Sequence, residues 1–283
     1  MGLRLYMEVY KVRRSIFDIL EEEMDLEYEI ETIMKLFNES RIYGYNLNYS
    51  LEDYFDQECI HLWKNRKYVT SSKQMRERLG VTDEDIRAGL DDKQILVLLE
   101  YILNVMSLCD AYMPEASEWS KEFGMLEQNV LNIVSSLNYE VKVLEEEEKT
   151  LLVEKSAAAT AVAEIMEAET AYTVIKYNHY LLKGDLVRKK QILKALADKF
   201  EGKKQQIKSI NNALASEIGC LLNKLNIRHN NMEGAKAEAF TKQLSPEELE
   251  EWYDDTYQLL LLAFLEEDNM KRRQRVKDLQ RQL

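Results

Sequence analysis

Apolar residues recur at every third or fourth position along most of this chain, which is the spacing of helices with one buried face. The pattern predicts helices over residues 3–37, about 117–137 and about 138–182. No stretch alternates convincingly between apolar and polar residues as a strand does. The strongest stripe steps by three and four through Ile207, Ile210, Leu214, Ile218, Leu221 and Leu225. The sequence therefore predicts an all-α fold, a helical bundle with long helices.

Helix-start signals support this reading in the first part of the chain. Ser50 with Asp53 and Thr82 with Asp85 have the spacing of capping boxes, in which each side chain bonds the other residue's backbone N–H. Asp91 can open the apolar helix that follows it. These signals predict helices that begin directly after residues 50, 82 and 91.

The second part of the chain has its own start and stop signals. Gly184 is predicted to end the helix over residues 138–182, and Gly202 to break the next helix. Residues 245–248, Ser-Pro-Glu-Glu, combine an N-cap, a proline at the first helical position and a glutamate at the third. The last helix is therefore expected to run from there almost to the C-terminus.

The proline-containing stretch YMPEAS at 112–117 is the best candidate for a domain boundary. It would divide the chain into an N-terminal helical region of unknown role, residues 1–113, and a helical bundle, residues 114–283. With only 2 prolines and 9 glycines in 283 residues, long helices are favoured over a turn-rich sheet protein.

Cysteine usage and hydropathy indicate the compartment. Cys59, Cys109 and Cys220 are odd in number, far apart in the sequence and lack a Cys-x-x-Cys pair, so we expect buried free thiols in a reducing cytosol. The N-terminus has no secretory h-region, and the longest apolar run, 259–265, is too short to span a bilayer. We expect a cytoplasmic protein, not a membrane protein, and no metal or cofactor.

Charge is spread unevenly along this acidic chain, whose formal net charge is −13. Residues 181–230 carry 11 Lys and Arg against 4 Asp and Glu, and the last 13 residues carry 6 against 1. A chain with segregated charge can present a basic face to a nucleic acid even when the whole is acidic. The alternative is that the lysines simply solvate helix faces.

The stretch LNKLNIRHNNMEG at 222–234 follows the strongest apolar stripe. One further helical turn would place Arg228 and His229 on the packing face, where a guanidinium needs a carboxylate, a helix C-terminus or a bound phosphate. The candidate carboxylates are Glu164, Glu167, Asp254 and Asp255. Alternatively, the helix ends near Asn226, and Arg228 and His229 cap it.

This stretch, the Lys-rich helix before it and the segment SPEELEEWYDDTYQLLLLAFLE after it resemble the HEPN superfamily of small all-α domains. The similarity covers about residues 114–283 and is to uncharacterised bacterial members found in host-defence and toxin settings. Catalytic HEPN domains are metal-independent ribonucleases that work as dimers. Their motif is an arginine, a polar neighbour and a histidine that is separated from the arginine by four to six residues. The resemblance implies an antiviral-defence or toxin-like endoribonuclease that acts on RNA.

In this sequence Arg228 matches the motif arginine and His229 its polar neighbour, but the histidine position falls on Glu233, Gly234 or Ala235. Metal-free RNA cleavage needs a base for the 2′-hydroxyl, an acid for the leaving oxygen and a cation for the phosphorane. An arginine can only stabilise charge, whereas a histidine titrates near neutrality. His229 is therefore the candidate acid or base.

The predicted site thus has a catalytic pair and an RNA-binding surface. Arg228 would bind phosphate beside His229, and Asn230 and Asn231 would position the RNA. The remaining RNA-binding candidates are the lysines of the preceding basic segment, Lys203, Lys204 and Lys208. The alternative is a non-catalytic helical interaction module that binds RNA, a partner protein or a second copy of itself. The missing histidine and the acidic remainder of the chain favour this alternative, whereas the polar cluster that continues an apolar stripe beside a basic segment favours the ribonuclease.

The other two histidines are interpreted as structural. Glu58 and His61 have the Glu-x-x-His spacing of di-iron bundles, but the chain has no second such pair. His179 lies among tyrosines near a predicted helix end, where it would pack or cap. Tyrosines in 42–49 and 250–258 could stack on bases or, more often, close a core.

Overall fold

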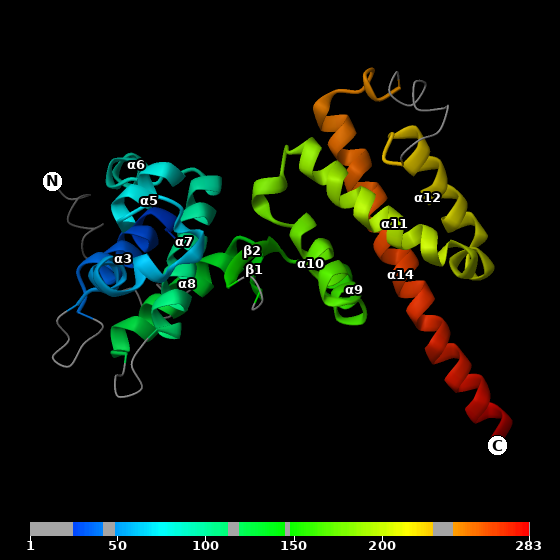
Figure 1. Cartoon of the computed structure of the whole chain (residues 1–283), viewed down its shortest axis with the longest axis horizontal. Coiled ribbons are helices and arrows are strands. Elements are labelled where there is room, and N and C mark those ends of the chain that lie inside the picture. Colours follow the sequence, from blue (N-terminus) through cyan, green and yellow to red (C-terminus); the bar gives the residue numbers. More distant parts are fainter. Residues whose placement is uncertain (1–24, 42–48, 113–118, 145–147, 229–239, 283) are drawn as a thin grey trace, which may run out of the picture. The chain divides into compact units, whose positions relative to one another are not determined.

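Helices dominate the structure, and two short antiparallel strands form one small sheet (Figure 1). The all-α prediction is confirmed. The computed structural model describes residues 25–41, 49–112, 119–144, 148–228 and 240–282.

The chain forms two compact units. The first unit comprises residues 1–98 and 108–133, and the second comprises residues 99–107 and 134–283. The boundary expected at residue 113 stays a prediction, because residues 113–118 lie outside the described part of the chain.

Helices of the first unit begin where the sequence signals them. Its elements are α3 (Leu26–Asn38), α4 (Leu51–Tyr54), α5 (Ser72–Leu79), α6 (Asp83–Ala88) and parts of α7 (Asp92–Ala111) and α8 (Lys121–Ser136). The capping boxes predicted at Ser50 and Thr82 are both present, and Asp91 caps α7. After α4 the chain continues through a π-helical turn (Phe55–Cys59) and two short 3₁₀ turns (Ile60–Leu62 and Lys64–Arg66).

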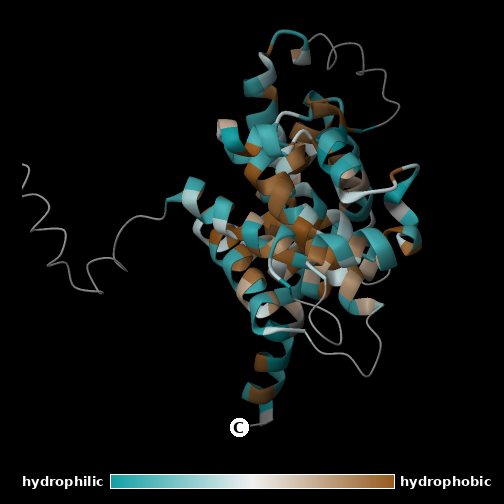
Figure 2. Cartoon of the chain, turned by 90° about the vertical axis from the view of Figure 1, so that its left-hand side faces the viewer, coloured by the Kyte–Doolittle hydropathy of each residue, from teal (hydrophilic) through white to brown (hydrophobic). Residues whose placement is uncertain are grey.

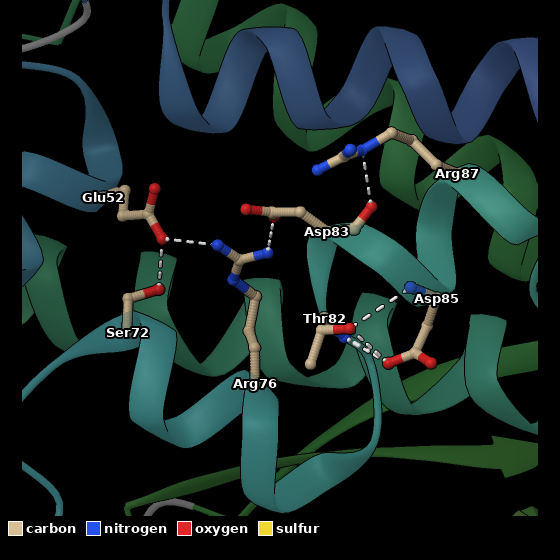
Figure 3. Close-up of polar contacts among 7 residues, drawn as sticks. All are labelled: Glu52, Ser72, Arg76, Thr82, Asp83, Asp85 and Arg87. Atoms are coloured by element: carbon tan, nitrogen blue, oxygen red, sulfur yellow. Dashed lines mark hydrogen bonds and ion pairs between the residues drawn. The ribbon is translucent and has the colours of Figure 1, made fainter.

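Arg76 of α5 ties three segments of the first unit together (Figure 3). Its guanidinium is buried and forms ion pairs with Glu52 of α4, at 3.1 Å, and with Asp83 of α6. Glu52 also accepts a hydrogen bond from the Ser72 hydroxyl at 2.7 Å. A guanidinium is tolerated in an interior when carboxylates neutralise it. This network therefore has a structural role.

Two of the three thiols meet inside the first unit. Cys59 and Cys109 are both buried and their side chains are hydrogen-bonded to each other. Burial of these two thiols was expected, but the same expectation is wrong for Cys220, which is exposed. The apolar face of its helix is formed instead by neighbours such as Ile218 and Leu222.

By length and composition, α7 is the one described helix that could cross a membrane. However, 56% of its apolar window is buried inside the protein. The core helix of a soluble protein has the same properties, so this is weak support for a membrane span.

The second unit is built around three long helices. Its elements are β1 (Tyr139–Leu144), β2 (Lys149–Glu154), α9 (Ala157–Ile165), α10 (Ala168–Tyr177), a 3₁₀ turn (Tyr180–Leu182), α11 (Leu186–Ile210), α12 (Asn212–Lys224) and α14 (Pro246–Gln282). α11 packs on α14, and α12 packs on both. The capping box predicted at Ser245 and Glu248 opens α14.

The helix expected over residues 138–182 is wrong in its first part, where β1 and β2 form a hairpin. Side chains of α7 hold its backbone: the Asn104 amide exchanges hydrogen bonds with Thr150, and Glu100 accepts from the Leu152 N–H at 2.7 Å. A two-stranded sheet is only marginally stable alone. These distant partners therefore explain why the local sequence pattern did not reveal the hairpin. Residues 145–147 of the acidic run lie outside the described part.

The break expected at Gly202 is also wrong, because α11 continues through it to Ile210. An interior glycine costs a helix only about 1 kcal/mol, and the burial of Phe200 and Ile207 on either side offsets that cost. The chain turns instead at Asn211, which caps α12. The stop predicted at Gly184 comes too late, because α10 already ends at Tyr177 and only the 3₁₀ turn over Tyr180–Leu182 separates it from Gly184, which has a left-handed φ of +81°.

Asp56 is a source of pH-dependent stability in the first unit. Burial, together with the nearby carboxylates Glu52 and Asp53, raises its pKa to about 6, against a hydrogen bond from the Ser72 N–H. Because its folded pKa is raised, the stability that Asp56 contributes is present below pH 4 and is lost as the pH rises through 6.

We expect Asp56→Asn to stabilise the first unit at pH 7–8 by about 1 kcal/mol, after allowance for solvent screening of this half-buried group. The amide oxygen can still accept the Ser72 N–H. The gain should vanish at pH 3.5, where both proteins are neutral at this position. Hydrogen exchange of α5 peptides at the two pH values measures the effect, and an equal gain at both pH values would contradict it.

Candidate functional site

The predicted catalytic arginine lies just beyond the end of α12. Asn226 adopts a left-handed conformation with φ +53°, and the Ile227 N–H donates back to the Leu222 carbonyl at 3.0 Å. The Asn226 N–H donates to the Asn223 carbonyl, so the helix ends in a Schellman motif. This confirms the alternative in which the helix ends near Asn226. Ile227, not Arg228, continues the buried stripe.

Arg228 is paired with a carboxylate of its own chain. Its guanidinium forms an ion pair with Glu201 of α11, and it donates a weak hydrogen bond to the Asn223 side chain at 3.4 Å. None of the four carboxylates expected from the sequence is this partner. Glu201 was not foreseen because it lies a whole helix away in sequence, and its proximity comes from the packing of α12 on α11.

Three cations line one surface hollow of about 410 Å³, which we name the basic hollow. Lys204 and Lys208 come from α11, and Arg228 from the end of α12. Its other lining residues are small or polar and come from α12: Asn212, Ala215, Ser216, Gly219, Cys220 and Asn223. Lys204 also lies 3.4 Å from Glu201, so one carboxylate serves two of the three cations.

The other predicted RNA-binding residues do not join this group. The Lys203 ammonium turns to α14, where it lies 2.7 Å from a Glu267 oxygen. His229, Asn230 and Asn231 lie outside the described residues. The structure thus brings together Lys204, Lys208 and Arg228, and separates Lys203 from them.

A second, larger cavity of about 600 Å³ lies where α10, α11 and α14 meet, and we name it the tyrosine cavity. Its wall includes Tyr177 and Tyr257, whose rings stack with centroids 4.0 Å apart. Beside them is Lys189, 6% exposed, with its ammonium 2.8 Å from Glu250 and 2.6 Å from Asp254. The cavity thus contains a buried cation that two carboxylates neutralise.

The titratable groups of this cavity are held by hydrogen bonds. Burial, and then the Asp254 carboxylate that accepts the Tyr177 hydroxyl, raise the pKa of Tyr177 well above its usual value. Burial raises the pKa of Glu250, but the Gly184 N–H and Lys189 outweigh it and hold that pKa below its usual value. These shifts widen the pH range over which Tyr177 is neutral and Glu250 is ionised.

His179 is likewise engaged at both ring nitrogens. Nδ1 accepts from the Leu181 N–H at 3.3 Å, so Nε2 carries the proton and donates to Glu100 at 2.9 Å. Glu100 also accepts from the Tyr180 hydroxyl and the Leu152 N–H. This confirms the packing and capping role expected for His179, because a histidine held in this way has no nitrogen left for a substrate.

The described part of the chain offers the basic hollow little catalytic chemistry. Its titratable lining consists of Lys204, Lys208, Cys220 and Arg228, without a carboxylate or histidine. Within the described ranges no three His, Cys, Asp or Glu side chains are placed to hold a metal ion, and Glu58 and His61 are both exposed. The arrangement is suited to binding an anion.

The tyrosines near the start of α14 were assigned two possible roles from the sequence. Tyr253 and Tyr257 are buried, so they close the core and are not available for base stacking. Lys189 was missed, although it continues the apolar stripe of α11 backwards from Ile192 and Leu196. A lysine in line with an apolar stripe is the sequence signal that could have revealed the buried ion pairs.

Comparison of this chain with protein-family models, curated proteins and solved structures finds no match. The HEPN resemblance therefore remains an expectation from the sequence, and the geometry described above carries the functional argument.

The buried ion pairs around Lys189 predict an asymmetry between two kinds of substitution. Glu250→Gln with Asp254→Asn would leave a buried ammonium without a carboxylate, and should destabilise the second unit by about 3 kcal/mol. Lys189→Met leaves two carboxylates that water can still reach, since their side chains are 20% and 47% exposed. It should cost only about 1 kcal/mol.

Urea denaturation followed by hydrogen exchange of α11 peptides measures both effects. The matched control is Glu247→Gln with Glu251→Gln, which removes the same charge from exposed positions of the same helix and should change stability by less than about 0.5 kcal/mol. A Lys189→Met protein less stable than the double carboxylate variant would refute the argument.

Proposed function

We propose that the second unit is a non-catalytic helical module that binds RNA through its phosphate backbone at the basic hollow. The observation that carries this proposal is the convergence of Lys204, Lys208 and Arg228 on one hollow that contains no acidic lining residue among those described. A defence or toxin setting, a homodimeric state and a cytoplasmic location follow only from the sequence and its HEPN resemblance.

Convergence distinguishes these cations from lysines that merely solvate a helix. A solvating lysine points away from its neighbours, because like charges repel and water screens each one separately. Here cations from two separate helices face a common hollow, and only Glu201 neutralises two of them. The remaining positive charge supports the binding of an anion with several charged oxygens.

Arg228 suits the recognition of phosphate. A guanidinium can donate two parallel hydrogen bonds to a phosphate, whereas a lysine acts as a point charge. Its side chain is 24% exposed, so it can be reached from the hollow. A phosphate would compete with Glu201 for the guanidinium, and Lys204 and Lys208 would add attraction that the carboxylate alone cannot offset.

The same contacts argue against catalysis by Arg228. In-line cleavage of RNA needs an acid and a base beside the cation. The described lining contains neither a histidine nor a carboxylate to fill these two roles. A guanidinium already paired with Glu201 would also be less effective in stabilising a phosphorane.

We expect Lys204→Gln with Lys208→Gln to weaken the binding of a labelled 20-nucleotide single-stranded RNA. Loss of two phosphate contacts should lower the affinity at 0.1 M salt by about tenfold and reduce the slope of log K against log salt by about 1.4. Fluorescence anisotropy at several salt concentrations measures both quantities.

Lys73→Gln with Lys93→Gln is the matched control, because it removes two exposed positive charges from the first unit. Both variants lower the net charge equally, so a purely global charge effect would weaken binding to the same extent. If the two variants bind alike, or if the unaltered protein binds no RNA, the proposed function is wrong.

Catalysis is tested separately with a mixed RNA pool in EDTA. We expect the purified protein to bind without cleaving, and Arg228→Ala to reduce binding. Cleavage that leaves 2′,3′-cyclic ends and is lost in both Arg228→Ala and His229→Ala would instead show a metal-independent ribonuclease with a displaced histidine.

A further inference from the structure

The C-terminal part of α14 extends beyond the helices that it packs on (Figure 1). Residues 272–281 are all exposed, whereas residues 260, 261, 263 and 264 of the same helix are fully buried. Figure 2 shows hydrophilic and hydrophobic segments mixed along this end of the chain. This segment, which we name the C-terminal arm, is therefore helical without burying a face.

The arm is strongly basic. Residues 272–281 carry 5 Lys and Arg against 1 acidic residue, Asp278. Arg272 pairs with Asp268 at 2.6 Å, and Arg281 lies 3.7 Å from Asp278. The structure gives no ion pair to Arg273, Arg275 or Lys277 within the described part of the chain. Three of the five cations of the arm are thus left for an external partner.

These cations have a regular arrangement. Arg273, Lys277 and Arg281 follow one another at intervals of four residues, so they form a ridge along one side of the helix, about 6 Å apart. Arg272 and Arg275 lie on the opposite side. A row of evenly spaced positive charges is complementary to a chain of phosphates, which are themselves evenly spaced.

The apolar content of the arm does not suit a membrane. A helix that lies on a bilayer needs a broad apolar face, usually with Trp, Phe or Leu, separated from its basic face. Within residues 272–281 the only apolar side chains are Val276 and Leu279, and Arg272 and Arg275 flank them. The mixture of cations and apolar residues on that side favours a polyanion over a lipid surface.

The arm leaves the bundle next to the basic hollow. One to two helical turns before the arm, Glu267 pairs with Lys203 and Glu266 accepts a hydrogen bond from the Asn211 side chain at 3.2 Å. Asn211 adjoins Asn212 in sequence, and Asn212 lines the hollow with Lys208. The hollow and the base of the arm are therefore anchored at the same turn between α11 and α12.

We propose that the C-terminal arm is a second phosphate-binding surface, which holds the backbone of the same RNA that occupies the basic hollow. This inference rests on the proposed function. The arm continues a helix that the core has already formed, so it needs no costly nucleation step and presents its cations already ordered. Ordered charges lose less entropy on binding than those of a flexible tail.

The test uses the full chain with Arg273→Gln, Arg275→Gln and Lys277→Gln together, because glutamine retains helix propensity. Anisotropy with the 20-nucleotide RNA should show affinity at 0.1 M salt reduced more than tenfold, and a salt slope smaller by about 2. The control variant, Lys73→Gln, Arg78→Gln and Lys93→Gln, removes three exposed charges from the first unit and should bind nearly as well as the unaltered protein. Circular dichroism checks that helix content is unchanged.

The outcomes separate the two proposals. If the hollow variant binds weakly and the arm variant binds normally, the arm is not an RNA contact, although the proposed function stands. If only the arm variant is weakened, the arm is supported and the hollow is refuted. If the protein fails to bind RNA and instead binds vesicles with 30% phosphatidylserine through the arm, both proposals are overturned.

Discussion

The packing of α11 against α14 sets the positions of α12 and of the C-terminal arm in the second unit. Lys189 reaches Glu250 and Asp254 near the start of each helix, and Lys203 reaches Glu267 further along, so the two helices run in the same direction. Apolar side chains fill the interface between these ion pairs, among them Leu196, Phe200, Leu260, Leu261 and Phe264. Apolar burial supplies most of the stabilisation, while the ion pairs restrict how the two helices can slide along each other.

This constraint creates both of the surfaces to which we assign a role. α12 turns back at Asn211 and packs on α11 and α14, which brings its C-terminal end to Glu201 and places Arg228 beside Lys204. α14, in contrast, is longer than its partner and continues after the partner has ended. The basic hollow forms because α12 folds back along α11. The C-terminal arm forms because α14 is longer than the helix on which it packs. Neither surface needs a specialised loop among the described residues.

Local sequence signals predicted the features that depend on interactions between residues close together in the sequence. The caps at Ser50, Thr82, Asp91 and Ser245 were all identified, because a cap is a bond between residues only a few positions apart. The hairpin was missed because its stability depends on Glu100 and Asn104, which lie about fifty residues earlier in the chain. The break at Gly202 was wrong for a related reason, since tertiary burial outweighs the weak intrinsic preference of a single glycine.

The same distinction applies to the candidate site. The sequence identified Arg228, Lys204 and Lys208 as a group with positive charge, but not their shared partner Glu201, because only the packing of the two helices brings it near. Lys203 looked equivalent to Lys204 in the sequence. One position along a helix changes the direction of a side chain by about 100°, which is enough to turn Lys203 towards α14.

The number of carboxylates around each cation distinguishes cations with a structural role from cations that can bind an external anion. Arg76 and Lys189, the two cations that are buried among the described residues, each have two carboxylates within ion-pair distance, as expected for charges that water cannot reach. In the basic hollow two cations share Glu201. On the arm, three of the five cations have no ion pair within the described part of the chain. The share of positive charge that carboxylates neutralise thus decreases from the buried cations to the basic hollow, and again to the C-terminal arm. An acidic protein that concentrates its uncompensated positive charge in this way can attract a polyanion locally, even though its net charge of −13 repels one at long range.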